Sequence, residues 1–337
     1  MIVGVDVGGT NARALLVDPE TGSVLGRHRT SSAGDGPTLV RSICVLVEHL
    51  RAEMANEANE ANEANEANEA NEANKANKAN EAVDAVGLGI AGLADRSGTL
   101  RYSPNLPHLT EFPIGPELAN AVGVPVTVGN DATAATLAEA RLGAGRGSDH
   151  FGLVTLGTGI GTGFVLDGHL LEGSHGFAGE AGHMVVDAHG PTHITGQQGP
   201  WEYFASGSAL GRLGREAAAK GGFDRGLEQA GTADGVTSHH LIAALSDDDA
   251  DAASIFDGFC REVARGVANL VVILDLERIV VGGGLTEIGE PLRSGIDHHL
   301  GDLLLGAEHR PGVEVRLAEL GDDAGALGAA LLAAGDA

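Results

Sequence analysis

The sequence predicts an α/β fold made of two related halves, and three observations carry this prediction. Short β-branched runs alternate with helical patterns along the 337 residues, an order typical of helices packed on sheets. Two strand pairs, one early and one mid-chain, turn through glycine-rich bends. The length leaves room for two domains. We therefore expect two halves that face each other across a cleft.

The first half begins with a predicted β-hairpin. Alternating apolar residues over 2–7 lead into the turn Gly8-Gly9-Thr10, as expected of a strand and its corner. Leu, Ile and Val at helical spacing predict a helix over 39–54. The other elements expected in this half are strands over 14–17, 23–29, 83–90 and 124–128 and a helix over 132–141.

A low-complexity tract interrupts the first half. Nine triplets of Ala-Asn-Glu, two of them changed to Ala-Asn-Lys, fill residues 55–81. A period of three against about 3.6 residues per turn moves alanine steadily around a helix, so no fixed apolar face forms. We expect an exposed helical extension or a mobile insertion without a chemical role.

The second half begins with another strand pair joined by a glycine-rich bend. Strands are expected over 151–156 and 163–166, and the residues between them include three glycines. From Tyr203 onward, long helical patterns dominate. The later elements expected are a helix over 252–275, strands over 277–281 and 316–320, and a terminal helix over 324–334.

The composition excludes several classes of partner. Asp and Glu total 47 against 21 Lys and Arg, a net charge of −26 that repels nucleic acid and anionic lipid. No apolar run approaches the ~18 residues that span a bilayer, and the first residues lack the features of a secretory signal. Cys44 and Cys260 lie far apart, as expected of buried thiols in a reducing compartment. We expect a cytoplasmic protein without nucleic-acid or membrane partners, whose acidic, lysine-poor surface is typical of a halophilic cytosol.

Three glycine-rich bends, each after a predicted strand, are candidates for binding nucleotide phosphates. Glycine lets backbone N–H groups approach an anion closely, and threonine hydroxyls add donors. One such bend alone is more simply a turn, and none fits the Rossmann or Walker A pattern, but three together favour phosphate binding. The candidate nucleotide contacts are Gly8, Gly9, Thr10 and Asn11, then Thr158, Gly159 and Gly161, then Gly282, Gly283 and Gly284.

Two aspartates at strand ends are the candidates for catalysis and metal binding. Asn130-Asp131 closes a strand and opens a helix, where an aspartate could simply cap the helix. The functional interpretation makes Asp131 the general base that takes the proton of a sugar hydroxyl as it attacks the γ-phosphoryl group of ATP. Asp6, beside the first bend, either hydrogen-bonds within the turn or holds Mg²⁺ through water.

The order of these motifs resembles that of the ROK family of sugar kinases. The resemblance covers essentially the whole chain apart from the triplet insertion, and Asp322–Ala329 looks like the family's closing helix. It implies an actin-like ATPase (ribonuclease H-like) fold, with one α/β domain in 1–134 and 320–337 and a larger one in 135–319. The matching motifs are Asp6–Asn11, Asn130-Asp131, Gly157–Gly161, Gly179-Glu180-x-Gly182-His183 and Gly282–Gly284.

The same resemblance implies a sugar site that includes Asp131. Glu180 and His183 would contact the sugar near its anomeric end, and Glu202 resembles a further sugar-binding carboxylate. Asn105 and Asn130 would bind other hydroxyls. Carboxylates, imidazole and amides are the side chains able to satisfy many O–H groups directionally. Judged alone, His183 would more simply be a structural histidine.

One feature departs from the family. Many members bind a structural zinc through a histidine like His183 and three cysteines. Here His193, Thr195 and Pro200 occupy the cysteine positions, so a tetrahedral Cys₃His site cannot form. His189 and His193 could in principle offer a poorer site. We expect no structural zinc and a loop held by packing around Trp201, which leaves the exact placement of His183 and Glu202 open.

The sequence thus predicts an ATP- and Mg²⁺-dependent hexose kinase, in the first place a glucokinase acting on O6 of glucose. Kinases for fructose, mannose or an N-acetylhexosamine are alternatives, as is polyphosphate as the donor. A sugar-responsive repressor of the same family would carry a helix-turn-helix before Asp6, where this chain leaves no room. A silent sugar sensor is disfavoured because Asp131 is intact. A homodimer is expected by analogy with relatives.

Overall fold

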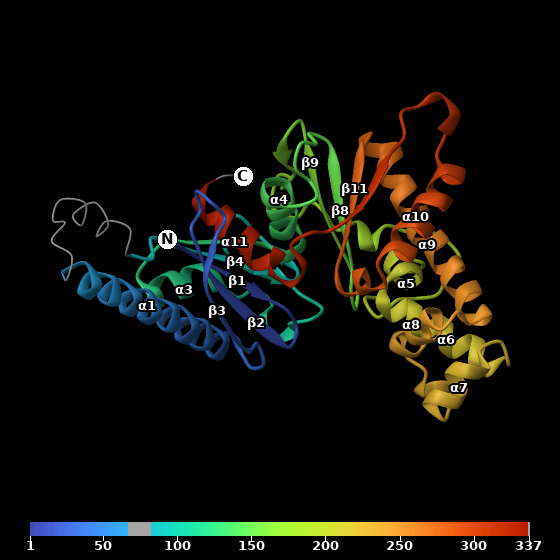
Figure 1. Ribbon diagram of the computed structural model, residues 1–337, viewed down its shortest axis with the longest axis horizontal. Helices are drawn as coiled ribbons and strands as arrows, with labels where there is room; N and C mark the ends of the chain where they lie inside the picture. Colours follow the sequence, from blue (N-terminus) through green and yellow to red (C-terminus); the bar gives the residue numbers. More distant parts are fainter. Residues whose placement is uncertain (67–81, 336–337) are drawn as a thin grey trace. The chain divides into compact units, whose positions relative to one another are not determined.

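The computed structural model describes residues 1–66 and 82–335, which divide into two compact units (Figure 1). Unit 1 comprises Met1–Leu142, His169–Ala178 and Asp322–Ala337, and unit 2 comprises Gly143–Gly168 and Gly179–Gly321. Both units combine a mixed sheet with helices, which confirms the predicted α/β class. Within the described ranges, none of the helices has the length and apolarity needed to cross a membrane.

Unit 1 is built on a sheet with the strand order β3-β2-β1-β4-β7. β1 pairs antiparallel with β2, and β2 with β3, as the predicted hairpin requires, whereas β4 and β7 extend the sheet in parallel. The strands are β1 (Ile2–Val7), β2 (Asn11–Val17), β3 (Val24–Ser31), β4 (Ala85–Ile90) and β7 (Val126–Asn130). Smaller strands are β5 (Leu93–Ala94), β6 (Leu100–Tyr102) and β10 (His169–Leu170).

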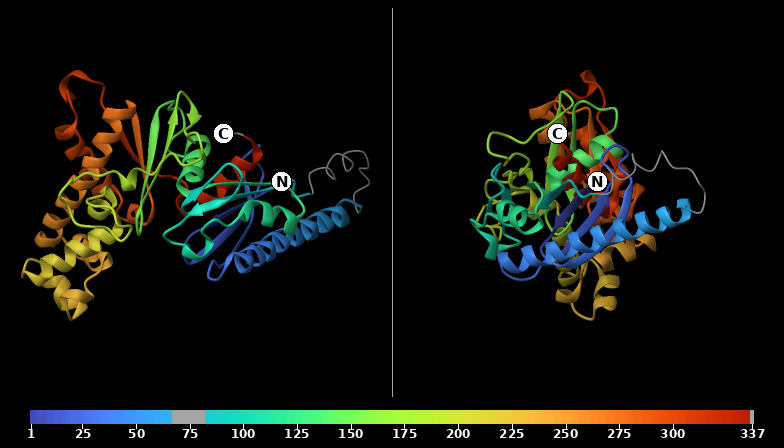
Figure 2. Two further views of the ribbon diagram at one scale, coloured as in Figure 1. Left: turned by 180° about the vertical axis from the view of Figure 1, so that it is seen from behind. Right: turned by 90° about the vertical axis from the view of Figure 1, so that its left-hand side faces the viewer.

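Different helices cover the two faces of this sheet. Alternate valines of β1 join a core cluster that includes the buried residues of α1 (Gly36–Glu66), with α3 (Ile114–Val122) packed beside it. On the other face α11 (Ala324–Ala334) lies against β1 and β4, and α4 (Asp131–Leu142) packs on α11. Figures 1 and 2 show α1 and α11 on opposite faces of the strands. Asp6 alternates with the valines, so it points toward α11.

Glycines let α11 approach closely. A Cβ added to Gly4 of β1 would lie 1.9 Å from a carbonyl oxygen of α11, and one added to Gly87 of β4 would lie 1.7 Å from another. Gly328 of α11 meets the backbone of α4 in the same way, at 1.7 Å. A side chain at any of these positions would force the layers apart. α11 is therefore held tightly against β1 and β4, and α4 is held tightly against α11.

Unit 2 repeats the plan of a glycine-cornered hairpin extended by parallel strands. Its sheet contains, in order, β9, β8, β11 and β12, with β8 and β9 antiparallel and the other neighbours parallel. These strands are β8 (Phe151–Leu156), β9 (Ile160–Leu166), β11 (Arg278–Gly282) and β12 (Glu314–Leu317). The helices are α5 (Trp201–Ala205), α6 (Gly207–Ala219), α7 (Asp224–Ala230), α8 (Ser238–Ser246), α9 (Ala250–Leu274) and α10 (Glu290–Leu303).

Trp201 anchors the helical part of unit 2, as expected for the cysteine-free segment before it. Its side chain is fully buried, and its indole N–H donates to the carbonyl oxygen of Glu262 at 2.9 Å. A Cβ added to Gly266 of α9 would lie 1.9 Å from the indole ring. Only a glycine at this position of α9 leaves room for the ring.

Several predicted boundaries differ from the observed ones. The domain boundary expected between 134 and 135 falls inside α4, and because α4 packs on α11, unit 1 continues to Leu142. The strand expected from 163 begins at Ile160, since its first residues pair with β8. The strand expected over 316–320 is β12, which ends at Leu317.

The helix expected over 39–54 is longer than predicted. It is α1, which begins at Gly36 and continues to Glu66, so the first triplets of the repeat are helical. The prediction for the remaining triplets, over 67–81, lies outside the described residues. Of the two cysteines expected to be buried, Cys260 is buried and Cys44 is only half-buried.

Candidate active site

The predicted site residues form two sets, one in each unit. In unit 1 the first bend, between β1 and β2, is closed by the N–H of Gly8, which donates to the carbonyl oxygen of Asn11 at 3.0 Å. Gly9, Thr10 and Asn11 are exposed. Asn105 lies beside the bend, because a Cβ added to Gly9 would meet the Asn105 Cβ at 3.6 Å. The bend therefore presents backbone and hydroxyl groups to solvent next to an amide side chain.

The Asp6 carboxyl lies against the first turn of α11. A Cβ added to Gly325 would lie 2.8 Å from the carboxyl carbon of Asp6. Burial and the negative charge of Asp131 raise the pKa of Asp6 to about 7, while Arg13 opposes the shift. Arg13 in turn donates to Asp322 Oδ2 at 2.8 Å. A carboxylate that is this costly to ionise suits a cation, which would compensate its charge.

Asn130 forms the N-cap of α4. Its Oδ1 accepts from the N–H groups of Ala132 at 2.9 Å and Thr133 at 3.0 Å, and its Nδ2 donates to the carbonyl oxygen of Gly92 at 3.2 Å. Asp131 is the first residue of α4, and its Oδ1 also accepts from Ala132, at 2.9 Å. Burial raises the pKa of Asp131, and this hydrogen bond opposes the shift. The capping interpretation thus applies to Asn130, which keeps its second amide hydrogen for a ligand.

In unit 2 the second bend, between β8 and β9, is held by the start of α6. The N–H of Gly207 donates to the carbonyl oxygen of Gly157 at 2.7 Å, and Ser208 Oγ donates to the carbonyl oxygen of Thr158 at 2.7 Å. The positive end of α6 therefore lies at the bend, where it favours an anion. Of the contacts predicted here, Thr158 and Gly159 lie in the bend and Gly161 lies in β9.

The motif Gly179-Glu180-x-Gly182-His183 is fixed to β9. The Thr162 hydroxyl donates to the carbonyl oxygen of Gly179 and accepts from a backbone N–H of the motif at 3.1 Å. A Cβ added to Gly179 or to Gly182 would lie 2.6 Å from a carbonyl oxygen of β9. Both glycines are therefore required by the close approach of the two segments. Glu180 precedes a short 3₁₀ turn and His183 ends it, and both side chains are half-buried.

Glu202, in the first turn of α5, lies against the second bend. Its Oε2 accepts from the N–H of Ile160 at 2.7 Å, and its Oε1 is 3.2 Å from Nε2 of His193. A Cβ added to Gly159 would lie 2.1 Å from Glu202 Oε2. The carboxylate predicted to bind sugar thus also orders the bend predicted to bind phosphate, a link that the sequence analysis did not foresee.

The third bend, Gly282 to Gly284, follows β11. Gly283 has a φ of 83°, and a Cβ added there would lie 2.6 Å from the carbonyl oxygen of Leu156 at the end of β8. Because β11 pairs in parallel with β8, the second and third bends lie at the same edge of the sheet. The three predicted residues of this bend are thereby brought next to the second bend.

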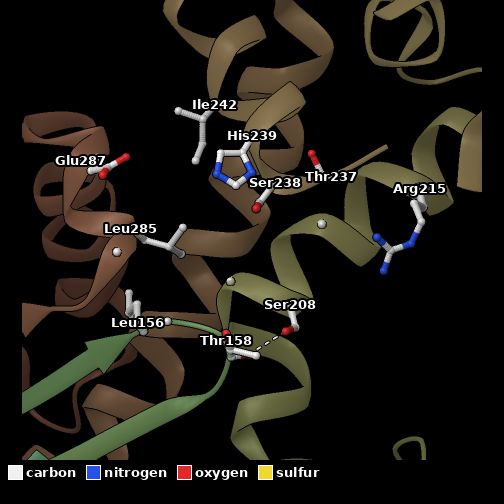
Figure 3. Close-up of a pocket in the computed structure, with 14 residues that line it drawn as sticks. Leu156, Thr158, Ser208, Arg215, Thr237, Ser238, His239, Ile242, Leu285 and Glu287 are labelled. Atoms are coloured by element: carbon white, nitrogen blue, oxygen red, sulfur yellow. Dashed lines mark hydrogen bonds between the residues drawn. The ribbon is translucent and has the colours of Figure 1, made fainter. Parts of the chain in front are cut away.

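These two bends line a cavity of about 560 Å³ within unit 2, a size suited to a nucleotide. Figure 3 shows Leu285 and Ile242 on one side and Arg215 on the other, with Thr158 and Ser208 joined below. The cavity therefore offers an apolar wall for a ring and polar groups for phosphates or a ribose. Lining residues that the sequence analysis missed are Gly207, Ser208, Gly211, Arg215, Thr237, Ser238, His239, Ile242, Leu285 and Glu287.

One local signal could have found part of this lining. Ser206 is the N-cap of α6, and its side chain accepts from the N–H of Ala209 at 3.2 Å. The run Ser206-Gly207-Ser208 therefore marked a helix start able to face an anion. Arg215 and His239 come from separate helices that only tertiary packing brings to the cavity, so no local pattern could place them.

The residues at the family's zinc position do not suit zinc. In residues 1–66 and 82–335, no three His, Cys, Asp or Glu side chains gather as metal ligands. His193 Nε2 contacts Glu202, and its Nδ1 is 3.0 Å from the Thr195 hydroxyl, so both ring nitrogens already have partners. Thr195 and Pro200 supply neither a thiolate nor an imidazole, so these positions do not close a structural zinc site.

Comparison with known proteins agrees with these motifs. The profile of the ROK family matches residues 69–336. A glucokinase of Thermotoga maritima is 38% identical over 249 residues, covering 72% of this chain and 77% of that protein. A glucokinase of Streptomyces coelicolor is 32% identical over 342 residues, covering 99% of this chain and 97% of that protein.

A solved structure extends the agreement to the fold. A ROK family glucokinase from Streptomyces griseus, in complex with glucose and AMPPNP, superposes with a TM-score of 0.81 at 33% identity, and the match covers 99% of each chain. The predicted actin-like ATPase fold is thereby confirmed, as is the predicted likeness to glucokinases. The chain belongs to the ROK family.

Proposed function

We propose that the chain is an ATP-dependent hexose kinase that transfers the γ-phosphoryl group to O6 of glucose. The observation that carries this proposal is the pair Asp6 and Asp131, two carboxyl groups whose pKa values burial raises. Because Asn130 caps α4, Asp131 is available for chemistry. The glucokinases that resemble the chain over most of its length support the same activity.

The donor site is assigned to the cavity of unit 2. Bends two and three line this cavity, and the positive end of the α6 dipole favours phosphate oxygens there. Ile242 and Leu285 supply an apolar wall for the adenine ring, and Arg215 a cation near it (Figure 3). The Streptomyces griseus relative was solved with AMPPNP, which supports ATP as the donor.

The chemistry is assigned to Asp131. As a sugar oxygen attacks the γ-phosphorus, the new O–P bond forms, the bond to the ADP oxygen breaks, and Asp131 accepts the hydroxyl proton. A raised pKa strengthens a carboxylate as a proton acceptor. Asp6 would hold Mg²⁺ through water, and the cation would offset phosphate charge. Asp6 fits this role because burial and the negative charge of Asp131 make its carboxylate costly to ionise, and a nearby cation would offset that cost.

Sugar contacts are assigned on the family resemblance. In unit 1 they are Asn105, through its amide, and Asn130, through its remaining Nδ2 hydrogen. In unit 2 they are Glu180, His183 and Glu202. The Streptomyces griseus relative was solved with glucose, which favours glucose over fructose, mannose or an N-acetylhexosamine. A non-catalytic sugar regulator is the second candidate, and the retained Asp131 speaks against it.

Three further predictions belong to this proposal. The net charge of −26 leads us to propose that the enzyme works in concentrated salt. The same net charge disfavours nucleic-acid and membrane partners, and the two free cysteines suit a reducing, cytoplasmic compartment. The homodimer rests on analogy alone.

The experiment is ADP release by purified protein in molar KCl with Mg-ATP across a panel of hexoses. We expect turnover with glucose, and a loss of about 10³-fold in kcat for Asp131→Asn because the base is removed. Asp302→Asn, an exposed carboxylate of α10, is the matched control and should keep full turnover.

Either component of the proposal can fail separately. Faster turnover with another hexose would reject glucose as the substrate. Binding of sugar without turnover on any member of the panel, with either ATP or polyphosphate, would favour the regulator. Turnover that survives in Asp131→Asn would remove Asp131 from the role of base.

A further inference from the structure

The loop over 184–200 of unit 2 folds back on itself through its backbone. Val185 forms a bridge with Pro200, and Thr192 with Gln198. At the tip, the N–H of His193 donates to the carbonyl oxygen of Gln197 at 2.7 Å, which closes a tight turn. These backbone contacts therefore fix the turn that carries His193, in a loop that contains no cysteine.

The His193 ring is held at both nitrogens. Nε2 lies 3.2 Å from Glu202 Oε1, and Nδ1 lies 3.0 Å from Thr195 Oγ1. The His193 and Glu202 side chains are 12% and 18% exposed, so this contact is largely sheltered from water. Hydrogen bonds to a charged acceptor in such surroundings are stronger than those at an open surface.

The Glu202 carboxylate links the His193 ring to the second bend. Its Oε1 faces His193 while its Oε2 accepts from the N–H of Ile160 at 2.7 Å. The absence of a Cβ at Gly159 lets the carboxylate lie directly on the bend. One carboxylate thus joins the loop and the bend, and each of its oxygens has a separate partner.

The same turn also touches the predicted sugar motif. Gln197 Nε2 donates to the carbonyl oxygen of His183 at 3.0 Å, and the His183 and His193 rings lie edge to face with centroids 6.4 Å apart. The His193 turn therefore contacts both segments of unit 2 to which the proposed function assigns ligands.

We propose that His193 is a positioning residue, which holds Glu202 against the second bend and orders the 184–200 loop without a metal ion. Its effect on catalysis rests on the proposed function, since Glu202 is assigned there to the sugar. Loss of His193 should weaken sugar binding more than it slows the chemical step, because Asp6 and Asp131 belong to unit 1.

The test compares the steady-state constants of five variants: His193→Ala, His193→Gln, His189→Ala, Glu202→Gln and the double variant of His193→Ala with Glu202→Gln. For His193→Ala we expect the KM for glucose to rise about tenfold, the size of one lost hydrogen bond to a charged group. His193→Gln should recover part of this loss, because its amide nitrogen can donate where Nε2 did. In a Glu202→Gln background, His193→Ala should add little. His189→Ala, an exposed histidine of the same loop, should behave as the wild type.

Three outcomes would overturn the proposal. The first is an unchanged KM for glucose in His193→Ala. The second is a double variant in which the separate effects of His193→Ala and Glu202→Gln on KM multiply. The third is one zinc ion per chain by metal analysis. If His193→Ala does not fold, Thr195→Val supplies a milder test, since it removes only the partner of Nδ1.

A second measurement separates this proposal from the proposed function. Denaturant unfolding of the wild type, both single variants and the double variant measures the coupling of His193 and Glu202 without any substrate. Coupling in a protein that phosphorylates no sugar would reject the proposed function and keep the positioning role. Additive effects on unfolding would reject the positioning role, whatever the turnover.

Discussion

The two glycine-cornered hairpins share a framework but differ in the residue two positions before the bend. Asp6 lies two residues before Gly8 in β1, and Thr155 lies two residues before Gly157 in β8. Val7 pairs with Ala12, whereas Leu156 pairs with Ile160, so the first bend is one residue longer. The strand pairs are otherwise built alike, and each is extended by parallel strands.

The difference lies in how these two side chains are satisfied. Thr155 Oγ1 accepts from the N–H of Gly161 at 3.2 Å and donates to its carbonyl oxygen at 3.3 Å, so the hydroxyl is used within the hairpin. Asp6 is instead a carboxyl with a pKa raised to about 7. The comparison teaches that the hairpin supplies backbone donors in both units, while a single position decides whether it also supplies charge.

The largest effect is expected from removing that charge. Asp6→Asn should lower kcat about 100-fold, the upper range for groups that orient a metal through its outer shell. Thr155→Val should lower kcat less than about tenfold, because it removes a neutral hydrogen bond. Turnover measured across a magnesium titration checks both. Equal losses in the two variants would mean that the hairpins do not differ in chemistry.

The next effect concerns the glycines of the two bends. A Cβ at Gly159 would overlap the Glu202 carboxylate at 2.1 Å, whereas a Cβ at Gly8 would meet only the Asn11 carbonyl oxygen, at 3.7 Å. Gly159→Ala should break the Ile160–Glu202 hydrogen bond and cost about 1–3 kcal/mol in unfolding free energy. Gly8→Ala should leave that free energy unchanged or slightly higher. Denaturant unfolding checks this, and a neutral Gly159→Ala would show that Glu202 is not held as described.

A smaller effect is expected in the pH dependence of stability. The pKa of Asp6 is about 7 in the folded chain and near 3.8 when exposed, so the folded state binds this proton more tightly than the unfolded state. As pH rises from 5 to 8 the folded state loses that advantage, and stability should fall. Asp6→Asn should remove this part of the slope, so its Tm should drop less than that of the wild type.

Thermal unfolding without magnesium or nucleotide, at pH 5 and pH 8, measures this difference. The expected gap between wild type and Asp6→Asn is a few degrees. Asp302→Asn, exposed on α10, should keep the wild-type slope. A slope that Asp6→Asn leaves intact would show that Asp6 ionises without cost.

The hairpins and helix starts were predictable because their signals are local. Asn130 precedes good helix formers, and glycines follow β-branched runs. Patterns within a few residues therefore predicted β1, β8 and α4. The family resemblance then assigned Glu180, His183 and Glu202. The sequence did not reveal that Asn130, rather than Asp131, forms the N-cap of α4, since either residue type can cap a helix.

The remaining features depend on contacts between distant segments. Glu202 meets the second bend through a hydrogen bond to Ile160, forty-two positions earlier, and no spacing rule predicts such a contact. The cavity lining from α6 and α8 is of the same kind, because Arg215 and His239 face it only after the helices pack. Side chains joined by tertiary packing were therefore the ones that sequence reasoning missed.

The smallest effect is expected where α1 leaves the core. The residues of α1 that join the core cluster of unit 1 lie between Leu39 and Leu50, and Met54 packs against its edge. Replacing Ala55–Glu81 with a short Gly-Ser linker keeps all of these residues, and loop length alone changes closure free energy slowly. Turnover should therefore stay within about twofold of the wild type, since no residue assigned to the site is removed. The coupled ADP assay in molar KCl measures this, and unfolding of the same variant detects any loss of stability. A large fall in kcat with unchanged unfolding would give the repeat a role in catalysis that the α1 core contacts do not explain.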